Sequence, residues 1–443
     1  MKTSSLLIRN GRVVDPSQDL DVTADLLIED GRVAGIGEDL GDAHTSLDAG
    51  GLLVVPGLID LHVQLREPGF EEDETIESGT SAALAGGYTT IACLPNTDPP
   101  IDTQAGVEFV LHQAQRANHC NVFVLAAVSK GCEGEQLAEI GSLVAAGAIG
   151  FTDATLPIHN AELMRHALQY CRMFDRPILN RPEVLELTRR GIMHEGLIST
   201  LLGLPGMPIE SEDVMTSRDV RLAEATGGRV HLMSLSSSGS IDLVRRAKAR
   251  DVAVTADVSP AHISFDDEEL RSFDANFKLN PPLRSANHVQ ECIEGLLDGT
   301  IDCIASAHAP RASEKNMLEL DKAPFGAVGL ETVLATVISR LVEPGHLSWL
   351  EAIAKLSTNP AQVLGLESKG SLALGADADV TLIDAQLDWV VNPLRFRSKS
   401  ANTPFAGCQL RGQAVATIVG GEIRWTSPDR MLEMRDASDL TTP

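Results

Sequence analysis

The sequence lacks cysteine pairs of the kind that bind zinc or build a disulfide framework. Its seven cysteines are scattered, odd in number and include no Cys-x-x-Cys pair, which is typical of reduced thiols in a cytoplasm. No stretch approaches the roughly 18 consecutive apolar residues of a membrane span. Residues 1–9 contain no apolar core of signal-peptide length. We therefore expect a cytoplasmic protein that does not enter a membrane.

Positive charge is also scarce. The 36 Lys and Arg residues face 62 Asp and Glu residues, which gives a formal net charge of −26. Such a chain repels a polyanion, so nucleic acid is excluded as a partner, whereas small molecules and proteins remain. The hydrophobic content of 43% and charged content of 22% are those of an ordinary globular protein. At 443 residues the chain suffices for several domains or for one large barrel with an appendage.

A βα series occupies the middle of the chain. Eight apolar segments are typical of strands, namely 54–60, 88–94, 122–127, 148–152, 177–180, 229–234, 252–256 and 301–306. Segments of helical period follow most of them, such as 73–86, 160–173, 240–250 and 329–341. This alternation predicts the α/β class and a (β/α)₈ TIM-like barrel. A doubly wound open sheet is the alternative, but no Gly-x-Gly-x-x-Gly follows the first strand.

Short apolar runs separated by turn signals occupy both ends of the chain. Asn10-Gly11 and Asp30-Gly31 are hairpin signals near the N-terminus, and Gly420-Gly421 is one near the C-terminus. These segments predict one β-sandwich domain built from residues 1–55 and 367–443, around a barrel of residues 56–366. Independent terminal hairpins are the alternative. The longest irregular connection, Arg181–Val214, contains four glycines and is expected to be a lid or an interface loop.

The chemistry of a barrel lies at the carboxyl ends of its strands. His62, Gln64 and Arg66 alternate along the end of the first strand and should point to one side. A hydrolytic metal site needs several His, Asp or Glu ligands and a carboxylate that carries the proton. The candidates at the eight strand ends are His62, Asp153, His231, Asp257 and His308. None of them forms a recognisable ligand pair by spacing.

Motifs along nearly the whole chain carry a resemblance to a known family. They are Leu53-Val-Val-Pro-Gly-Leu-Ile-Asp-Leu-His, Arg66-Glu-Pro-Gly, Thr75-Ile-Glu-Ser-Gly-Thr, Gly86-Gly-Tyr-Thr-Thr, Leu94-Pro-Asn-Thr, Phe277-Lys-Leu-Asn-Pro-Pro-Leu-Arg, Pro324-Phe-Gly-Ala-Val-Gly-Leu-Glu-Thr, Asn359-Pro-Ala and Asn402-Thr-Pro-Phe. In these motifs the chain resembles the dihydroorotases of the amidohydrolase superfamily. The resemblance implies the barrel with its terminal sandwich. It also implies hydrolysis and formation of the dihydroorotate ring in pyrimidine synthesis, with one or two zinc ions.

The metal positions that the resemblance implies are occupied differently here. They hold His62, Gln64, Ala154, Arg181 and Ser234, and the family's catalytic aspartate is replaced by Ala307. Only His62 remains among the six, with Asp153 as a substitute if the register slips by one residue. Gln and Ser are poor zinc ligands, Ala does not bind, and a guanidinium repels a cation. We therefore expect no zinc cofactor and no base that takes a proton from water.

The substrate side of the resemblance is better preserved. It implies that Arg66, Asn96 and Asn280 hold the dihydroorotate carboxylate and ring, that Phe325-Gly326 forms a substrate-contacting turn, and that Arg311 replaces a substrate-contacting histidine. We expect Arg66, Arg181 and Arg311 to converge on one metal-free cavity for a small anionic metabolite.

A purely structural role is the alternative for several of these residues. Arg181 and Arg311 could instead form ion pairs with Asp153, Asp257 or a lid carboxylate. His62 could hydrogen-bond to Gln64. His231 and His308 are expected to be buried histidines with satisfied hydrogen bonds rather than ligands.

The preferred interpretation is a non-catalytic dihydroorotase-like protein, a pseudoenzyme of pyrimidine biosynthesis. Such homologues serve as structural partners of aspartate carbamoyltransferase, so the resemblance implies this partner, a homo-oligomer, or both. The alternative is an active dihydroorotase or cyclic amidohydrolase with an unusual metal site that forms N-carbamoyl-aspartate. A metabolite sensor that uses the arginine cavity is the third interpretation. Measurements of metal content and of dihydroorotate turnover would distinguish the non-catalytic interpretation from the active enzyme.

Overall fold

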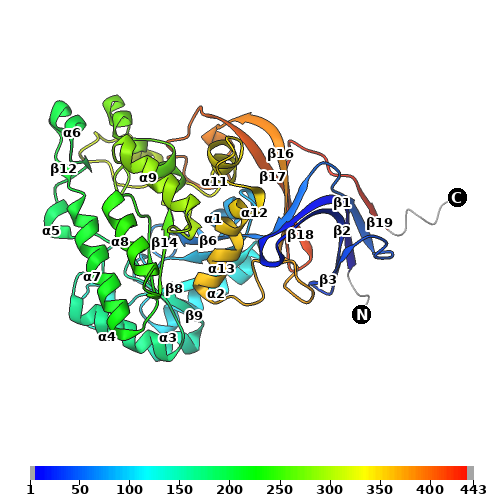
Figure 1. The fold of residues 1–443 in the computed structure, drawn as a ribbon, viewed down its shortest axis with the longest axis horizontal. Helices are drawn as coiled ribbons and strands as arrows, with labels where there is room; N and C mark the ends of the chain where they lie inside the picture. The colour runs from blue at the N-terminus through cyan, green and yellow to red at the C-terminus, as the bar shows by residue number, and fades with distance from the viewer. Residues whose placement is uncertain (1–4, 437–443) are drawn as a thin grey trace.

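A computed structural model describes residues 5–436. Strands from both ends of the chain form one nine-stranded sheet (Figure 1). Its strands are β1 (Ser5–Asp15), β2 (Leu20–Glu29), β3 (Arg32–Gly37), β4 (Thr45–Asp48), β5 (Leu53–Pro56), β16 (Val380–Val390), β17 (Gln409–Val419), β18 (Glu422–Thr426) and β19 (Met434–Asp436). The two ends meet where β5 pairs antiparallel with β16. Buried side chains from both ends share one hydrophobic cluster, which includes Leu26, Val54 and Leu382.

One of the three predicted hairpin turns is wrong. Asn10-Gly11 lies within β1 as a bulge, because Asn10 takes a φ of 60° and the register with β2 shifts between Ile8 and Gly11. A Cβ at Gly11 would lie 2.3 Å from the Val54 side chain, so only glycine allows this close approach. The bulge divides β1, whose first half pairs with β4 and whose second half pairs with β5. Asp30-Gly31 and Gly420-Gly421 do form turns between paired strands.

The predicted (β/α)₈ barrel is confirmed. Its parallel strands are β6 (Leu58–Val63), β7 (Tyr88–Cys93), β8 (Asn121–Ala126), β9 (Ala148–Phe151), β10 (Ile178–Asn180), β13 (Val230–Leu232), β14 (Val254–Val258) and β15 (Cys303–Ile304). A bridge between Val63 and His308 brings the two ends of this sheet together, and Gln64 N donates to His308 O at 3.0 Å. The predicted first strand, 54–60, is divided, since residues up to Pro56 belong to the terminal sheet.

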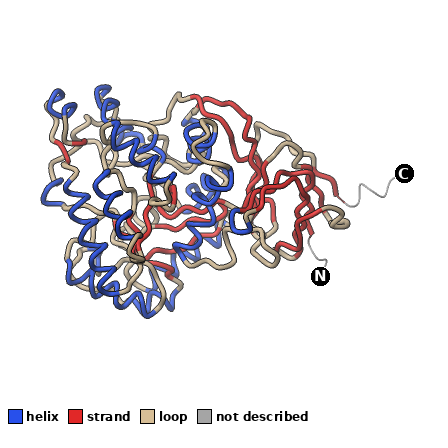
Figure 2. Tube along the Cα trace, in the orientation of Figure 1, coloured by secondary structure: helices blue, strands red, loops and turns tan. Residues whose placement is uncertain are grey.

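Helices surround the barrel (Figure 2). They are α1 (Ile76–Ala85), α2 (Gln104–Ala117), α3 (Ile140–Ala146), α4 (Ala161–Met173), α5 (Leu185–Thr188), α6 (Leu197–Leu202), α7 (Glu210–Thr226), α8 (Ser238–Lys248), α9 (Ala286–Leu297), α10 (Ser313–Asn316), α11 (Val333–Val337), α12 (Trp349–Ile353) and α13 (Asn359–Leu364). Two π-helical segments, η6 (Ile338–Val342) and η7 (Ala354–Thr358), continue α11 and α12. Short segments of 3₁₀ helix are η1 (Pro16–Gln18), η2 (Lys130–Cys132), η3 (Pro260–Ile263), η4 (Asp267–Ser272), η5 (Ala275–Phe277) and η8 (Pro393–Arg395). None of the described helices is long and apolar enough to cross a membrane.

The connection 181–214 is more regular than predicted. It contains α5, α6, the start of α7 and a small parallel pair of strands, β11 (Met193–His194) and β12 (Gly206–Met207). Gly206 is required for this packing, because a Cβ there would lie 2.5 Å from the Cα of Glu195. The segment is therefore a folded insertion beside the barrel, and its elements are too short to give a periodic sequence signal.

Two layers of apolar side chains hold the barrel together. Alternate strand residues such as Ile59, Leu125 and Leu179 form one cluster inside it. Their neighbours, such as Ile91 and Val124, pack in a second cluster with the surrounding helices. Because strand side chains alternate between faces, both layers follow from near-continuous apolar strands. The barrel interior is therefore a packed core rather than a pore.

Candidate active site at the barrel mouth

A cavity of about 410 Å³ opens at the carboxyl ends of the barrel strands. Nine of the sequence-predicted residues line it, namely His62, Gln64, Arg181, Ser234, Asn280, Ala307, Arg311, Phe325 and Gly326. Four others do not, namely Arg66, Asn96, Asp153 and Ala154. Most of the predicted positions thus meet in one place, as expected for residues that follow successive parallel strands.

Arg181 forms an ion pair with Glu183, a carboxylate of the connection 181–214. Its Nη2 lies 2.6 Å from Glu183 Oε2, and both side chains are buried. Thr188 Oγ1 and Asn280 Nδ2 also donate to Glu183, at 2.5 and 3.2 Å. Burial lowers the pKa of Arg181, and the negative charge of Glu183 opposes that shift. The alternative of an ion pair with a lid carboxylate is confirmed, because Glu183 lies in the connection 181–214. Asp153 and Asp257, the other two partners considered, bind Ser129 and His231 instead.

Arg66 and Arg311 lie at one corner of the barrel mouth. Arg311 Nε donates to Phe325 O at 3.0 Å, and its Nη1 lies 3.6 Å from Asp73. Arg66 Nε donates to Pro310 O at 3.3 Å, whereas its Nη2 is buried and has no acceptor within residues 5–436. Burial, assisted by the charge of Arg311, lowers the pKa of Arg66 to about 9. The expected convergence of three arginines on the cavity is therefore wrong for Arg66, because only Arg181 and Arg311 line it.

His62 contacts a different partner from the one considered. Its Nδ1 lies 3.3 Å from Ser234 Oγ, whereas Gln64 Oε1 accepts a hydrogen bond from Asn96 Nδ2 at 3.0 Å. Burial lowers the pKa of His62 to about 4, and the positive charge of Arg181 acts in the same direction. The imidazole is therefore neutral near pH 7 and is a weak base. Asn96 acts on the cavity only through Gln64.

His231 and His308 are bound into networks beside the cavity. His231 Nε2 lies 2.8 Å from Asp257 Oδ2, and Ser234 N donates to the other oxygen of Asp257 at 2.8 Å. His308 Nδ1 accepts from Gly329 N at 3.3 Å, so its Nε2 carries the proton and faces Glu74 at 3.4 Å. Neither histidine lines the cavity. Both fix the backbone from which the lining residues project.

Asp153 is unsuited to replace the missing metal ligands. Its carboxylate accepts hydrogen bonds from Val128 N at 2.9 Å and from both N and Oγ of Ser129, at 3.0 and 2.5 Å. Burial raises its pKa despite these donors. With this carboxylate directed at a neighbouring loop and Ala154 outside the cavity lining, the suggested slip of register by one residue does not bring a ligand to the site.

The residues at the barrel mouth do not fit a zinc ion. Within residues 5–436, no three His, Cys, Asp or Glu side chains gather in a way that could hold a metal. Gln64, Ser234 and Ala307 contribute no strong ligand, and Glu183, the one carboxylate among the lining residues, is paired with Arg181. What the cavity offers instead is guanidinium and amide N–H groups, which suit a carboxylate or a phosphate.

A strap of residues 397–405 closes one side of the barrel mouth. Lys399 N donates to Glu74 Oε1 at 3.0 Å, and Asn402 Nδ2 donates to Gly326 O at 2.9 Å. These contacts tie a segment that lies between β16 and β17 to loops of the barrel. The sequence motif that begins at Asn402 therefore has a structural role in holding the wall of the cavity.

The closed parallel barrel, the sheet built from both termini and the cavity at the strand ends define a protein of the amidohydrolase type. Among solved structures, L-hydantoinase from Arthrobacter aurescens matches with a TM-score of 0.86 at 25% identity, over 94% of this chain and 95% of that one. D-hydantoinase from Thermus sp. matches with a TM-score of 0.79 at 23% identity, over 95% and 96%.

Sequence comparison identifies the family. Residues 51–240 match the model described as "Dihydro-orotase-like", and residues 324–424 match "Amidohydrolase family". A dihydroorotase of Pelotomaculum thermopropionicum is 49% identical over 94% of this chain and 98% of its own length. That of Syntrophotalea carbinolica is 45% identical over 96% and 100%. The chain belongs to the dihydroorotase family of the amidohydrolase superfamily.

Proposed function

We propose that this protein is a non-catalytic dihydroorotase-like member of pyrimidine biosynthesis that binds a small anion at the barrel mouth and supports aspartate carbamoyltransferase as a structural partner. The observation that carries the proposal is the composition of the cavity. The resemblance to dihydroorotases places Ala307 at the position of the family's catalytic aspartate, and the Arg181–Glu183 ion pair lines the cavity together with Ala307 and His62. The names of the relatives support the pathway.

The polar groups of the cavity are poorly suited to activate water. His62 has a pKa of about 4 and contacts Ser234, so it attracts a proton weakly at neutral pH. Glu183 accepts from Arg181, Thr188 and Asn280, so both of its oxygens already accept hydrogen bonds. Hydrolysis of a cyclic amide needs both a base and a polarised carbonyl. The barrel mouth of this chain therefore offers hydrogen-bond donors but no suitable base.

The same donors favour an anionic metabolite. Arg311 presents its guanidinium to the cavity beside the Phe325-Gly326 turn, and Asn280 lies on the same lining. A small cyclic carboxylate such as dihydroorotate has a volume and charge that suit a cavity of about 410 Å³. Arg66, with one buried Nη2 that has no acceptor in the described chain, adds positive potential beside Arg311.

An apolar rim near the barrel mouth supports the partner proposal. The rim consists of Leu197, Leu201, Phe273, Met317 and Leu318, all exposed. Leu197 and Leu201 are four residues apart in α6, so they share one helix face. Helix α6 contacts η4, and Asn316 Nδ2 donates to Asn276 Oδ1 at 2.6 Å, which joins the segments that carry the other members. Exposed apolar clusters of this kind mark protein interfaces.

The first test combines metal analysis, turnover and calorimetry. Protein purified without chelator is expected to contain no stoichiometric zinc and to show no dihydroorotate turnover. Calorimetry is expected to detect binding of dihydroorotate or N-carbamoyl-aspartate, weakened about tenfold by Arg311→Gln. Arg116→Gln, on the exposed face of α2, is the matched control. Stoichiometric zinc with turnover would establish the active alternative, and no binding at millimolar concentration would remove the anion pocket.

The second test addresses the partner. Aspartate carbamoyltransferase of the same organism is expected to co-elute with this protein in size-exclusion chromatography. Leu201→Lys should weaken the complex at least tenfold, because it places a charge within an apolar contact. Leu374→Lys, at a residue that is 79% exposed and outside the rim, should leave the complex intact. Separate elution of the two proteins, with this chain forming only its own oligomer, would contradict the partner proposal.

A further inference from the structure

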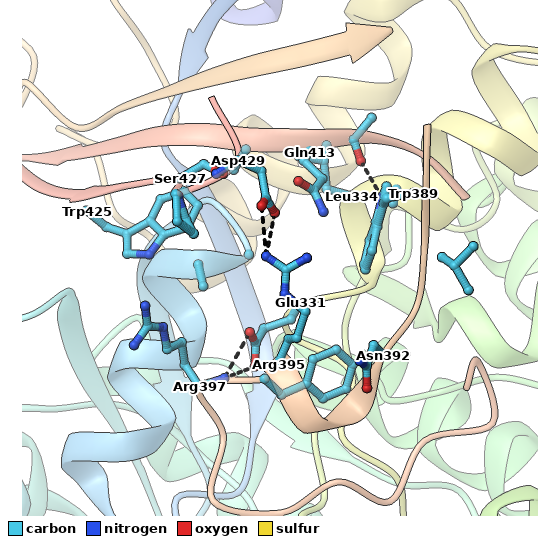
Figure 3. Close-up of a pocket in the computed structure, with 18 residues that line it drawn as sticks. Glu331, Leu334, Trp389, Asn392, Arg395, Arg397, Gln413, Trp425, Ser427 and Asp429 are labelled. Carbon is cyan, nitrogen blue, oxygen red and sulfur yellow. Dashed lines mark hydrogen bonds and ion pairs between the residues drawn. The ribbon is translucent and has the colours of Figure 1, made fainter. Parts of the chain in front are cut away.

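A second cavity lies at the junction of the barrel and the terminal sheet, away from the barrel mouth. This junction pocket has a volume of about 250 Å³, and none of its residues lines the first cavity. Helix α11, the ends of β16 and β18, and the segment 392–397 surround it (Figure 3). Nothing in the proposed function requires an opening here, and its size suits a ligand of a single ring rather than a large cofactor.

Flat aromatic side chains form its walls. The chain contains three tryptophans, and two of them, Trp389 and Trp425, line this one pocket together with Phe396 and Leu334. Figure 3 shows the two indoles on opposite sides of the opening. Trp389 Nε1 donates to Gly412 O at 3.2 Å, which fixes the orientation of its ring. Rigid aromatic faces bind planar rings with little loss of side-chain entropy.

Polar groups of the pocket divide into paired and free ones. Arg395 Nη2 contacts both oxygens of Asp429 at 2.8 Å, so its charge is satisfied. Within residues 5–436, the Arg397 guanidinium and the Gln413 amide have no hydrogen bond or ion pair, and both residues line the pocket. A free guanidinium beside aromatic walls is a good partner for a carboxylate or a phosphate.

Glu331 positions the free arginine. Its carboxylate accepts from Arg397 N at 2.8 and 3.0 Å and from Ser398 N at 3.2 Å. These bonds anchor the backbone of the segment at the base of the pocket, as the dashed lines in Figure 3 show for Arg397. The Arg397 side chain extends away from Glu331 on the side of Trp425. The backbone is thus fixed while the guanidinium remains available.

We propose that the junction pocket binds a small planar ring that carries a carboxylate or a phosphate. The ring lies against the indoles of Trp389 and Trp425, and the anionic group is bound by Arg397, with the Gln413 amide available to the polar edge of the ring. The chemistry of recognition is the same for both anions. This site is separate from the barrel mouth and is occupied whether or not the barrel mouth binds a metabolite.

Tryptophan fluorescence provides the test, since the third tryptophan, Trp349, begins α12 and does not line the pocket. The full chain is titrated with nicotinate and with phenyl phosphate, which separate carboxylate from phosphate recognition. Nicotinamide keeps the ring without the charge, and cyclohexanecarboxylate keeps the charge without the flat ring. We expect a saturable change at millimolar concentration with one or both planar anions, and at least tenfold weaker binding of the two control compounds.

Three variants locate the signal. Arg397→Gln should weaken binding of the planar anion at least tenfold, while Arg116→Gln, an exposed arginine of α2, should not. Arg311→Gln should also leave this titration unchanged, because Arg311 belongs to the other cavity. The proposal is overturned if no compound gives a saturable change, if cyclohexanecarboxylate binds as well as nicotinate, or if Arg397→Gln binds like the parent. Loss of the signal in Arg311→Gln would assign it to the barrel mouth and equally overturn the proposal.

Discussion

The side chains that line the barrel mouth and those that support it differ in how much of the fold depends on them. Ala307, Gln64 and Ser234 face the cavity, and each makes at most one side-chain hydrogen bond in the described structure. Asp257 and Glu74 stand beside them, and each holds a histidine and a backbone N–H group. The departures from the dihydroorotase motifs lie mainly among the residues that face the cavity.

This difference indicates how residues at the mouth of such a barrel can be exchanged while the barrel persists. A side chain that projects into open space contributes to function but little to folding, so its replacement costs almost no stability. A buried carboxylate that satisfies two donors is different, because its removal leaves both donors unpaired. Activity and fold are therefore separable at this strand edge, even though the residues concerned are neighbours in the chain.

The largest expected effect is that of Asp257→Ala. The change leaves His231 Nε2 and Ser234 N without the acceptor that each has at 2.8 Å. We expect the free energy of unfolding to fall by about 3–5 kcal/mol, as is usual when one partner of a buried polar network is removed. Urea denaturation followed by circular dichroism measures it. A loss below about 1 kcal/mol would mean that supporting residues are as dispensable as lining ones.

A pH-dependent effect is expected at Asp60, another supporting residue. It accepts from His62 N and Ser306 N at 2.8 and 2.9 Å, and burial raises its pKa to about 7. An unfolded aspartate titrates near pH 4, so between about pH 4 and 7 the folded chain retains a proton that the unfolded chain has released. Stability contributed by Asp60 therefore declines as pH rises, by at most about 1.4 kcal/mol per unit.

The Asp60→Asn variant isolates this contribution. The histidines of low pKa are present in both proteins, so their effects cancel when the two free energies of unfolding are subtracted. We expect the parent to lose stability relative to the variant as the pH is raised from about 4.5 to about 7. A difference that is independent of pH would show that Asp60 is ionised in the folded chain.

The smallest expected effect is that of Ser234→Ala at the cavity wall. The change removes one long hydrogen bond, 3.3 Å to His62 Nδ1, and leaves the bond from Ser234 N to Asp257 intact. We expect a loss below about 1 kcal/mol, with unchanged anion binding in calorimetry. Asp257→Ala, measured in parallel, is the reference. A loss of unfolding free energy as large as that of Asp257→Ala would show that lining and supporting side chains contribute equally to stability.

The barrel was predictable because its strands are long apolar segments in regular alternation with helical ones. The failures have local causes. The apolar run from Leu52 to Val63 contains no charged break before Asp60, so sequence could not show that Gly57 separates strands of two sheets. A Cβ at Gly57 would lie 2.0 Å from Thr89 Oγ1, a close contact between distant segments. Asn10-Gly11 has the composition of a hairpin turn but forms a bulge. Composition does not separate the two, because hairpin turns and bulges use the same backbone conformations.

The location of the site could be predicted from the sequence, but most contacts between its side chains could not. Strand order brought His62, Arg181 and Ser234 to one cavity, since each lies at the carboxyl end of a barrel strand. Side-chain pairing was decided by rotamers and loop paths that no periodicity encodes. Thus Arg181 binds Glu183 rather than Asp153, because Asp153 is directed at the Ser129 loop.

The antiparallel pairing of β5 with β16 also has a consequence for biosynthesis. Pro56 and Val380 are register partners, so the first strands to leave the ribosome wait for more than three hundred residues before this edge of their sheet is covered. At ordinary rates of translation this delay is on the order of tens of seconds. During that time the apolar edge of β5 is open to wrong pairing. The nascent chain is therefore expected to depend on chaperones most strongly before β16 emerges.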